Sequence, residues 1–256
     1  MNFKKASIYL IALLLLAACR SAAEETGGGS DIHWSYEGEE GPAHWGELDP
    51  GFAACGVGDH QSPIDVTTTD ERDVANIEFH YQQSDVLIVN NGHTVQVDYE
   101  GGSYIELDGN RFDVLQFHYH APSEHAVNGE LFAAELHIVH ANADDRLAVV
   151  GILLAEGEEN AAYTSFIDNL AAEETEGVET GDRINALELL PDVQTTYRYS
   201  GSLTTPPCSE GVLWLLMTTP VELSGQQIAA METVFEGNNR PVQPIFERTV
   251  TEDTTP

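Results

Sequence analysis

Lysine is almost absent from this chain of 256 residues. Both of its lysines, Lys4 and Lys5, lie in the first segment. The 10 lysines and arginines stand against 43 acidic residues, so the formal net charge at pH 7 is −33. Such a surface repels nucleic acid and anionic lipid, because both carry dense negative charge. The composition therefore argues against a nucleic-acid-binding protein.

An excess of acid with so little lysine is typical of adaptation to high salt, where screening relieves the self-repulsion of the surface. We state a halophilic source as a hypothesis. Its plainer alternative is an acidic exported protein with no dependence on salt. Unfolding at low and at high salt separates the two, because equal stability in both would contradict salt adaptation.

Long hydrophobic runs are also lacking. The apolar run Ile8–Ala18 is too short to span a bilayer comfortably, and it follows the positive pair Lys4-Lys5. These features are typical of an export signal, so we predict that residues 1–18 are a signal peptide. The expected location of the mature protein is the periplasmic or extracellular face of a membrane.

The predicted signal ends in Leu16-Ala17-Ala18-Cys19, which resembles a bacterial lipoprotein signal. In such a signal Cys19 becomes the lipidated first residue, so a lipid anchor would be the only attachment to the membrane. The alternative is ordinary cleavage with Cys19 incidental. Residues 19–30 include Gly27-Gly28-Gly29-Ser30 and predict a flexible tether. We assign residues 31–250 to one domain and residues 251–256 to a tail.

Cysteine is scarce, with three in the whole chain. If Cys19 carries lipid, Cys55 and Cys208 remain. Export implies an oxidising compartment, so a disulfide between these two is the expected state. Two free buried thiols are the alternative. A bridge would restrain the loop that contains Thr204, because Cys208 follows Leu203-Thr204-Thr205-Pro206-Pro207 directly.

The chain from residue 61 to about 155 is a series of short runs with β-strand character, separated by turn signals such as Asn91-Gly92 and Asp108-Gly109. The short connections predict mostly antiparallel pairing. Another strand is expected at Gly211–Thr218, and helices at Glu159–Ala172 and after Ser224 as far as Phe235. The predicted fold is mainly β (α+β): a single domain on a large, twisted, mostly antiparallel sheet with a few peripheral helices. The predicted runs are Val86–Val89, Thr94–Tyr99, Tyr104–Leu107, Val114–His120, Ala133–His140 and Leu147–Leu154.

Histidines recur at alternate positions of two of these strands. His118 and His120 share one face of the first strand, because side chains two apart on a strand point the same way. If the second strand is a neighbour, His137 joins them. Three histidines with no fourth protein ligand are typical of an open, catalytic zinc site. The alternative for the His-x-His pair alone is two histidines hydrogen-bonded within a mixed core.

Gln116 and Glu135 each lie two positions before a candidate ligand and on the same face. Both are suited to accept a hydrogen bond from a ligand ring and so to fix its orientation and tautomer. Three histidines with two such acceptors favour a metal site over a hydrogen-bonded core.

These segments resemble the α-class carbonic anhydrases, and the resemblance extends over most of the chain after about residue 32. It implies the fold of that family, here in its bacterial branch, and one activity: reversible hydration of carbon dioxide to bicarbonate and a proton by a zinc-bound hydroxide. The matching motifs are His33–Tyr36, Gly41–Trp45, Gln61–Asp65, Asn90–His93, Gln116–His120, Ser123–His125, Glu135–His140, Gly201–Pro207 and Asn238–Pro244.

The resemblance also implies a role for each catalytic residue. Zn²⁺ is held by His118, His120 and His137. Thr204 accepts a hydrogen bond from the hydroxide and donates its own to Glu124, which rejects ligands that have no hydrogen to donate to Thr204. The implied partners are therefore carbon dioxide and bicarbonate, with sulfonamides and anions as inhibitors. Bacterial members are often dimers, so a homodimer is one expected state, although no segment of the sequence marks an interface.

His93 matches the proton shuttle of the family and is expected as an exposed histidine at the cavity mouth. In the family Asn is frequent at the position of Gln96. The rate of proton transfer through the water molecules that lead to His93 therefore stays open. The backbone carbonyl of Asn238 is implied as the acceptor for the His120 ring, and His125 and His140 as buried structural histidines. The residues implied for the proton-path water are Tyr36, Asn91 and Gln96, and those implied for the substrate pocket are Val139, Val149, Leu203, Thr205, Val212 and Trp214.

Two other functions stay open at this point. One is a non-catalytic binding or adhesion protein on the same fold, but such relatives typically lack a zinc histidine. The other is a zinc hydrolase that acts on esters, although no general acid for a poor leaving group is evident.

Overall fold

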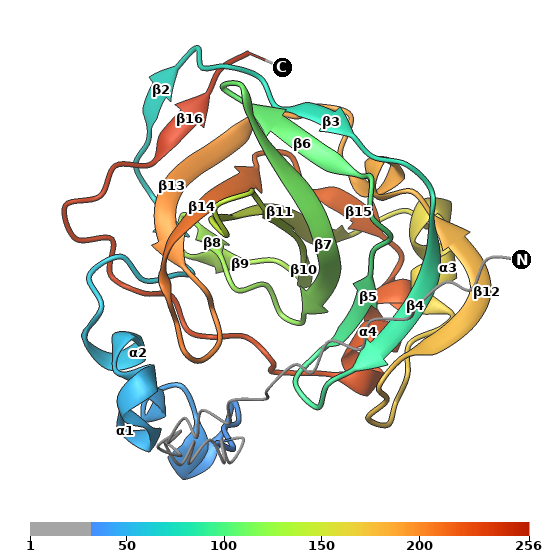
Figure 1. Cartoon of the computed structure of the whole chain (residues 1–256), viewed down its shortest axis with the longest axis horizontal. Helices are drawn as coiled ribbons and strands as arrows, with labels where there is room; N and C mark the ends of the chain where they lie inside the picture. The colour runs from blue at the N-terminus through green and yellow to red at the C-terminus, as the bar shows by residue number, and fades with distance from the viewer. Residues whose placement is uncertain (1–31, 256) are drawn as a thin grey trace, which may run out of the picture. The chain divides into compact units, whose positions relative to one another are not determined.

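One large sheet is the central element of the computed structural model, which describes residues 32–255 (Figure 1). Its main path runs β12-β4-β5-β7-β10-β11-β14-β13-β16-β2, with β6 joining β7 to β3 and with β15 paired to β11. A second, three-stranded sheet has the order β1-β8-β9. From His33 onward the described residues form one structural unit.

The strand and helix bounds are as follows. The large sheet contains β2 (Asp70–Arg72), β3 (Glu78–His80), β4 (Ser84–Asn90), β5 (Val95–Asp98), β6 (Tyr104–Leu107), β7 (Asn110–His120), β10 (Ala134–Ala141), β11 (Leu147–Glu156), β12 (Val178–Ile184), β13 (Thr196–Ser202), β14 (Glu210–Met217), β15 (Val221–Leu223) and β16 (Thr251–Asp253). The small sheet contains β1 (Asp65–Val66), β8 (Ala126–Val127) and β9 (Glu130–Leu131). The helices are α1 (Trp45–Leu48), α2 (Ala54–Val57), α3 (Thr164–Ile167) and α4 (Gly225–Val234).

Most pairings are antiparallel, including the central β5-β7-β10-β11 group, so the predicted sheet is confirmed. The sheet is nevertheless mixed, because β11 is parallel to both β14 and β15, and β16 is parallel to β2. A parallel neighbour requires a long crossover. The chain accordingly passes through α3, β12 and β13 between the end of β11 and the start of β14.

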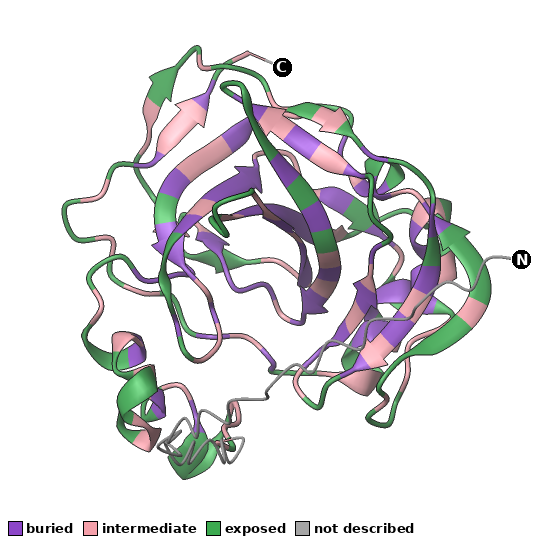
Figure 2. Cartoon of the chain, in the orientation of Figure 1, coloured by how far each residue is buried: buried purple, intermediate pink, exposed green. Residues whose placement is uncertain are grey.

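A β-bulge in β7 decides which side chains face the site. Gln116 pairs with Val139 of β10, but the next pair along is Val114 with His140, so Leu115 has no partner. A bulge shifts the alternation of the strand by one residue. Phe112 and Val114 before the bulge belong to the same buried core as Phe117 and Tyr119 after it, so Gln116, His118 and His120 lie on the other face of the strand. Figure 2 shows buried and exposed residues alternating along the sheet.

The core has two parts, one on each face of the sheet at β11 and β14. Val150 and Leu215 belong to the larger apolar cluster, which also contains Phe117 and the buried apolar side chains of α3 and α4. Their chain neighbours Val149 and Trp214 belong to the second cluster. Adjacent residues of a strand point to opposite faces, so the second cluster lies on the face of the sheet that carries the candidate site.

The helix after Ser224 is confirmed. Ser224 caps α4: its Oγ accepts the N–H of Gln227, and Gln227 Oε1 accepts the N–H of Ser224 at 3.1 Å. This reciprocal pair satisfies two amide groups that a helix start leaves free.

The expected helix over Glu159–Ala172 is wrong in extent. Only a 3₁₀ turn at Ala161–Tyr163 and the single α-turn of α3 form there. Asn160 caps the start of the 3₁₀ turn, because its Oδ1 accepts the N–H of Ala162. Past α3 the amides bond three residues back, as Leu170 N–H does to Ile167 O, so the helix tightens and ends.

The C-terminal residues assigned to a tail contribute a strand. Thr251–Asp253 forms β16 between β13 and β2, and Asp253 Oδ2 accepts Arg198 Nη2 at 2.8 Å with both side chains largely shielded from solvent. The predicted signal peptide, Cys19 and the predicted tether lie outside the described residues. Among the helices of residues 32–255, none has the length and apolar character needed to cross a membrane.

Candidate active site

Three histidines converge where β7 and β10 pair. His118 lies directly opposite His137, and His120 opposite Glu135, in the antiparallel register. The ring centroids are 4.8 to 5.2 Å apart. One nitrogen from each ring lies within 4.8 Å of the others, a spacing that one metal ion can bridge. The pairing of two strands thus brings together three rings that the sequence separates.

Each ring uses one nitrogen in a hydrogen bond, and its other nitrogen makes none to the residues that the structure describes. The pairs are His118 Nδ1 with Gln116 Oε1 at 2.9 Å, His120 Nδ1 with the Asn238 carbonyl at 2.6 Å, and His137 Nε2 with Glu135 Oε1 at 2.8 Å. His120 Nε2 is buried and has no hydrogen-bond partner among the described residues. A buried nitrogen without a partner is costly in a core but suits a metal ligand. The donor set, three imidazole nitrogens with an open fourth position, fits zinc.

Burial controls the charge of two of these rings. It holds the pKa of His118 well below the usual value, and the neighbouring rings lower it further. Burial likewise lowers the pKa of His120. Glu135 raises the pKa of His137 against the effect of burial. Neutral imidazoles are the form that binds metal, so the site disfavours protons at two of its three nitrogens before any ion binds.

A second group, His125, Glu135 and His137, also has its donor atoms close together. Here the atoms are already paired, because His125 bonds Glu135 through Nδ1 at 2.7 Å and Tyr199 through Nε2 at 2.6 Å. Glu135 Oε2 accepts two main-chain N–H groups. The group is a saturated hydrogen-bond network, and the reading of His125 as structural is confirmed.

His140 is structural in the same way. Its Nε2 lies 2.8 Å from the Tyr81 hydroxyl and its Nδ1 3.2 Å from the Ala148 carbonyl. Burial lowers its pKa to about 4, so the ring is neutral at physiological pH.

A small cavity of about 130 Å³ opens over His118 and His120, whereas His137 does not line it. Its lining comprises Trp34, Tyr36, Asn91, His93, Thr94, Gln96, Gln116, His118, His120 and Thr205. His93 is half-buried, because its ring stacks on Trp34 with centroids 3.6 Å apart. The expectation of an exposed histidine is wrong to that extent. Trp34 lies in the motif His33–Tyr36, but no spacing rule relates it to His93.

The three residues expected to order the proton-path water all line this cavity, but two have their side chains engaged elsewhere. Asn91 Oδ1 accepts the N–H groups of His93 and Thr94, so it holds the turn that presents His93. Gln96 Nε2 donates to Asp98 Oδ1 at 2.6 Å. Tyr36 has a buried hydroxyl without a partner among the described residues, and burial raises its pKa well above the usual value.

Glu124 is fully buried, and its two oxygens have different surroundings. Oε1 accepts the main-chain N–H of Arg240 at 2.8 Å. Oε2 has no hydrogen-bond partner in the described structure and lies 3.5 Å from His120 Nε2. The expected hydrogen bond from Thr204 to Glu124 is therefore not formed at Oε2. Thr204 is buried in the loop between β13 and β14, and the Glu124 carboxylate keeps one oxygen without a hydrogen bond on the histidine side.

Comparisons with known proteins bear on this geometry. The family model of eukaryotic-type carbonic anhydrases matches residues 40–254. A carbonic anhydrase from Nostoc sp. is 44% identical over 229 residues, which are 86% of this chain and 86% of that protein. One from Pectobacterium atrosepticum is 40% identical over 240 residues, 93% of this chain and 96% of that protein. The chain belongs to the α-class carbonic anhydrases.

A solved structure agrees with this assignment. The α-carbonic anhydrase from Thermovibrio ammonificans, in complex with the inhibitor sulfanilamide, superposes with a TM-score of 0.83 at 42% identity and covers 86% of this chain and 99% of that chain. The chain is thus a carbonic anhydrase in sequence and in fold.

In this carbonic anhydrase the apolar residues expected at the substrate pocket gather in the second core cluster. Val139, Val149, Leu203, Val212 and Trp214 all belong to it or pack against it. The Trp214 ring lies 4.9 Å from the His137 ring between centroids. The cluster therefore forms an apolar wall beside the histidines, while Thr205 lines the cavity itself.

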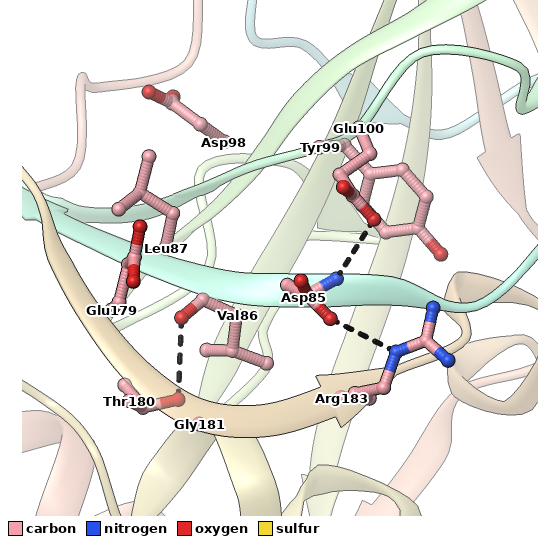
Figure 3. A pocket seen from close by; sticks show the side chains of 10 residues that line it. All are labelled: Asp85, Val86, Leu87, Asp98, Tyr99, Glu100, Glu179, Thr180, Gly181 and Arg183. Atoms are coloured by element: carbon pink, nitrogen blue, oxygen red, sulfur yellow. Dashed lines mark hydrogen bonds and ion pairs between the residues drawn. The ribbon is translucent and has the colours of Figure 1, made fainter.

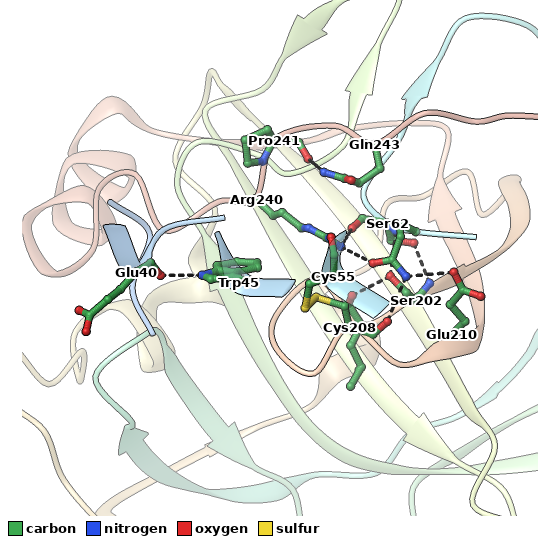
Figure 4. Close-up of a disulfide and its surroundings, with 12 residues drawn as sticks. Glu40, Trp45, Cys55, Ser62, Ser202, Cys208, Glu210, Arg240, Pro241 and Gln243 are labelled. Atoms are coloured by element: carbon green, nitrogen blue, oxygen red, sulfur yellow. Dashed lines mark hydrogen bonds between the residues drawn. A yellow bond between two sulfur atoms is a disulfide. The ribbon is translucent and has the colours of Figure 1, made fainter. Parts of the chain in front are cut away.

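The expected disulfide is present, between Cys55 and Cys208 (Figure 4). Cys208 is fully buried and its N–H bonds the Thr205 carbonyl at 2.8 Å. Leu203 N–H bonds the Ser209 carbonyl across the same loop. The bridge thus closes on the loop that carries Thr204 and ties it to α2.

Another cleft of this carbonic anhydrase, about 650 Å³, lies between β4, β5 and β12 (Figure 3). Asp85 and Arg183 form an ion pair of 2.9 Å in it, and Asp85 N–H bonds Glu100. None of the residues predicted for the site lines it. The histidine cavity is smaller, but it is the one that the predicted site residues line.

Proposed function

We propose that this carbonic anhydrase catalyses the reversible hydration of carbon dioxide with one Zn²⁺ held by His118, His120 and His137. The observation that carries the proposal is the convergence of three ring nitrogens, one of them buried without a partner. Bound zinc lowers the pKa of a coordinated water to about 7 and so supplies a nucleophile at neutral pH, an effect for which carbonic anhydrase is itself the standard example.

The proposed roles of the protein groups follow from their chemistry. Gln116, Glu135 and the Asn238 carbonyl hold the ring tautomers that keep the ligand nitrogens free. The apolar wall around Trp214 offers carbon dioxide a surface without competing hydrogen bonds. A Thr204 hydroxyl can donate and accept a hydrogen bond at once, whereas a carboxylate such as that of Glu124 only accepts. If the Thr204 hydroxyl donates to Glu124 Oε2, its own oxygen stays free to accept a hydrogen bond from the substrate side.

The test of this function compares carbon dioxide hydration with ester hydrolysis, each with and without a zinc chelator, and measures metal content. We expect one zinc per chain, hydration that the chelator removes, and inhibition by an aromatic sulfonamide. The sulfanilamide complex of the Thermovibrio ammonificans relative supports the last expectation. Ester hydrolysis without hydration would favour a zinc hydrolase, and neither activity would favour a binding protein.

His93 is the proposed proton shuttle, since it lines the cavity and an imidazole can exchange protons with buffer. We expect His93→Ala to slow turnover at least about tenfold in weak buffer and to be rescued by added imidazole.

The pH dependence gives a second prediction for His93. Burial lowers the pKa of His93, as does His33, while Glu174 raises it. The neutral, proton-accepting form therefore persists to lower pH than for a free histidine, and the His93-dependent rate should persist with it. Stopped-flow hydration across buffer concentration and pH checks this; a full rate at low buffer would remove the assignment.

Export and lipid anchoring are a separate proposal. The Cys55–Cys208 disulfide supports an oxidising compartment. We expect the mature protein to begin at a diacylated Cys19 and to partition into detergent. Mass spectrometry of the N-terminal peptide measures this directly, and an unmodified start at another residue would contradict the anchor.

A further inference from the structure

Three amide side chains line the histidine cavity, those of Asn91, Gln96 and Gln116. An amide has one acceptor oxygen and one donor NH₂ group, so the end that is engaged elsewhere decides which end is left for the cavity. Asn91 Oδ1 accepts two main-chain N–H groups of its own turn, both at 3.0 Å, so Asn91 keeps its NH₂ group. Gln116 Oε1 lies 2.9 Å from His118 Nδ1, so Gln116 keeps its NH₂ group as well.

Gln96 is turned the opposite way. Its Nε2 donates to Asp98 Oδ1 at 2.6 Å, and its side chain forms no other hydrogen bond with the described residues. An ionised carboxylate only accepts, so the Gln96 amide can face Asp98 only with its NH₂ group. Hydrogen bonds to a charged acceptor are about twice as strong as neutral ones, which favours this one orientation. The polar atom that Gln96 keeps for the cavity is therefore its carbonyl oxygen, Oε1.

Asp98 reaches Gln96 from outside the histidine cavity. The two residues lie two positions apart on β5 and so share a face of the sheet. On the neighbouring β7, Gln96 lies opposite His118 and Asp98 opposite Gln116. Asp98 lines the larger cleft between β4, β5 and β12 and does not line the histidine cavity (Figure 3). One hydrogen bond thus joins a charged group in the cleft to an amide in the cavity.

The orientation of Gln96 matters for any water that carries a proton through this cavity. A water molecule that contacts Gln96 Oε1 has to donate a hydrogen to it, whereas one that contacts an NH₂ group has to accept. A carbonyl on one side and NH₂ groups on the other therefore orient water in one sense. A proton moves along hydrogen bonds from donor to acceptor, so such an order favours transfer to His93, which lines the same cavity.

We propose that Asp98 is a positioning residue for proton transfer: it holds the carbonyl oxygen of Gln96 toward the cavity and so orients the water that leads to His93. The inference rests on the proposed role of His93. Its first test measures the hydrogen bond itself on the protein as purified. The outcome of that test does not depend on carbon dioxide hydration, so a failure of the inference and a failure of the proposed function are distinguishable.

The first test is NMR of the glutamine side-chain amides in the full chain labelled with ¹⁵N, with Gln96→Leu to assign the Gln96 signal. We expect one NH₂ proton of Gln96 to lie downfield of the other glutamine amides and to exchange with water about tenfold more slowly. Asp98→Ala should remove both features. A Gln96 signal that resembles those of exposed glutamines, or one that Asp98→Ala leaves unchanged, would overturn the proposal.

The second test separates a positioning role from a structural one by the kinetics of hydration. Proton transfer to buffer enters kcat but not kcat/KM, so we expect Asp98→Ala to lower kcat about threefold and to leave kcat/KM unchanged. Asp98→Asn keeps an acceptor oxygen and should restore part of kcat. In a His93→Ala background Asp98→Ala should cause no further loss, because both residues act on the same path.

The matched control is Asp85→Ala. Asp85 lines the same cleft as Asp98, but its carboxylate pairs with Arg183 and not with a residue of the histidine cavity. This variant removes an equal charge from the cleft and should keep the wild-type kcat and the Gln96 amide signal. An equal loss of kcat in Asp85→Ala, a parallel loss of kcat/KM in Asp98→Ala, or a full kcat in Asp98→Ala would each overturn the positioning role.

Discussion

His118→Ala is expected to lose zinc and carbon dioxide hydration together. The substitution removes one of three converging nitrogens, and it also removes the His118 ring that is hydrogen-bonded to the Gln116 amide. Loss of an outer partner of a ligand alone weakens metal binding about 10- to 100-fold, so loss of a ligand should cost more than about 100-fold. Zinc content after dialysis against a weak chelator and stopped-flow hydration measure the two effects on the same sample.

The matched control is His80→Ala. His80 lies in β3 on another part of the sheet, where its ring stacks on Tyr104 at the surface. This variant should keep one zinc and the full rate. A His118→Ala protein that retained stoichiometric zinc and normal turnover would show that the histidine cluster is not the metal site.

The candidate site was largely predictable because its chemistry is local. Residues two apart on a strand share a face, so Gln116, His118 and His120 could be placed together from the sequence, and Glu135 with His137. That β7 pairs with β10 was a condition of this prediction, because residues 121–133, which include β8 and β9, lie between the two strands. What alternation could not show is the bulge at Leu115. Counted without it, Phe112 and Val114 would share a face with His118, whereas they lie in the core.

Other features were out of reach because they depend on contacts distant in sequence. The stacking of His93 on Trp34 joins segments that no pattern links, and it changes an expected exposed shuttle into a half-buried one. The sequence marks Arg240 as part of a motif, but a charged residue gives no sign that it will be buried without an ion pair. β16 was missed because a strand of three residues has no periodicity to detect.

Replacing both cysteines by serine is expected to produce the second largest effect. Cys55 and Cys208 are 153 residues apart, so the bridge closes a long loop in the unfolded chain. On the chain-entropy model its removal lowers the free energy of unfolding by about 4–5 kcal/mol, a large part of the stability of a domain. Denaturant unfolding of the wild type and the double serine variant measures the difference.

The same substitution should reach the site, because Cys208 anchors the loop that carries Thr204 and its carbonyl accepts from Gln61. We expect a lower kcat/KM for hydration with zinc content unchanged, since none of the three histidines depends on the bridge. Reductant supplies the control: it should shift the wild type toward the variant and leave the variant as it was. Equal stability with and without the bridge would mean that the unfolded chain is already confined by other contacts. A kcat/KM that stays at the wild-type value would mean that the hydrogen bonds across residues 203–209 hold Thr204 in place without help from the sulfur atoms.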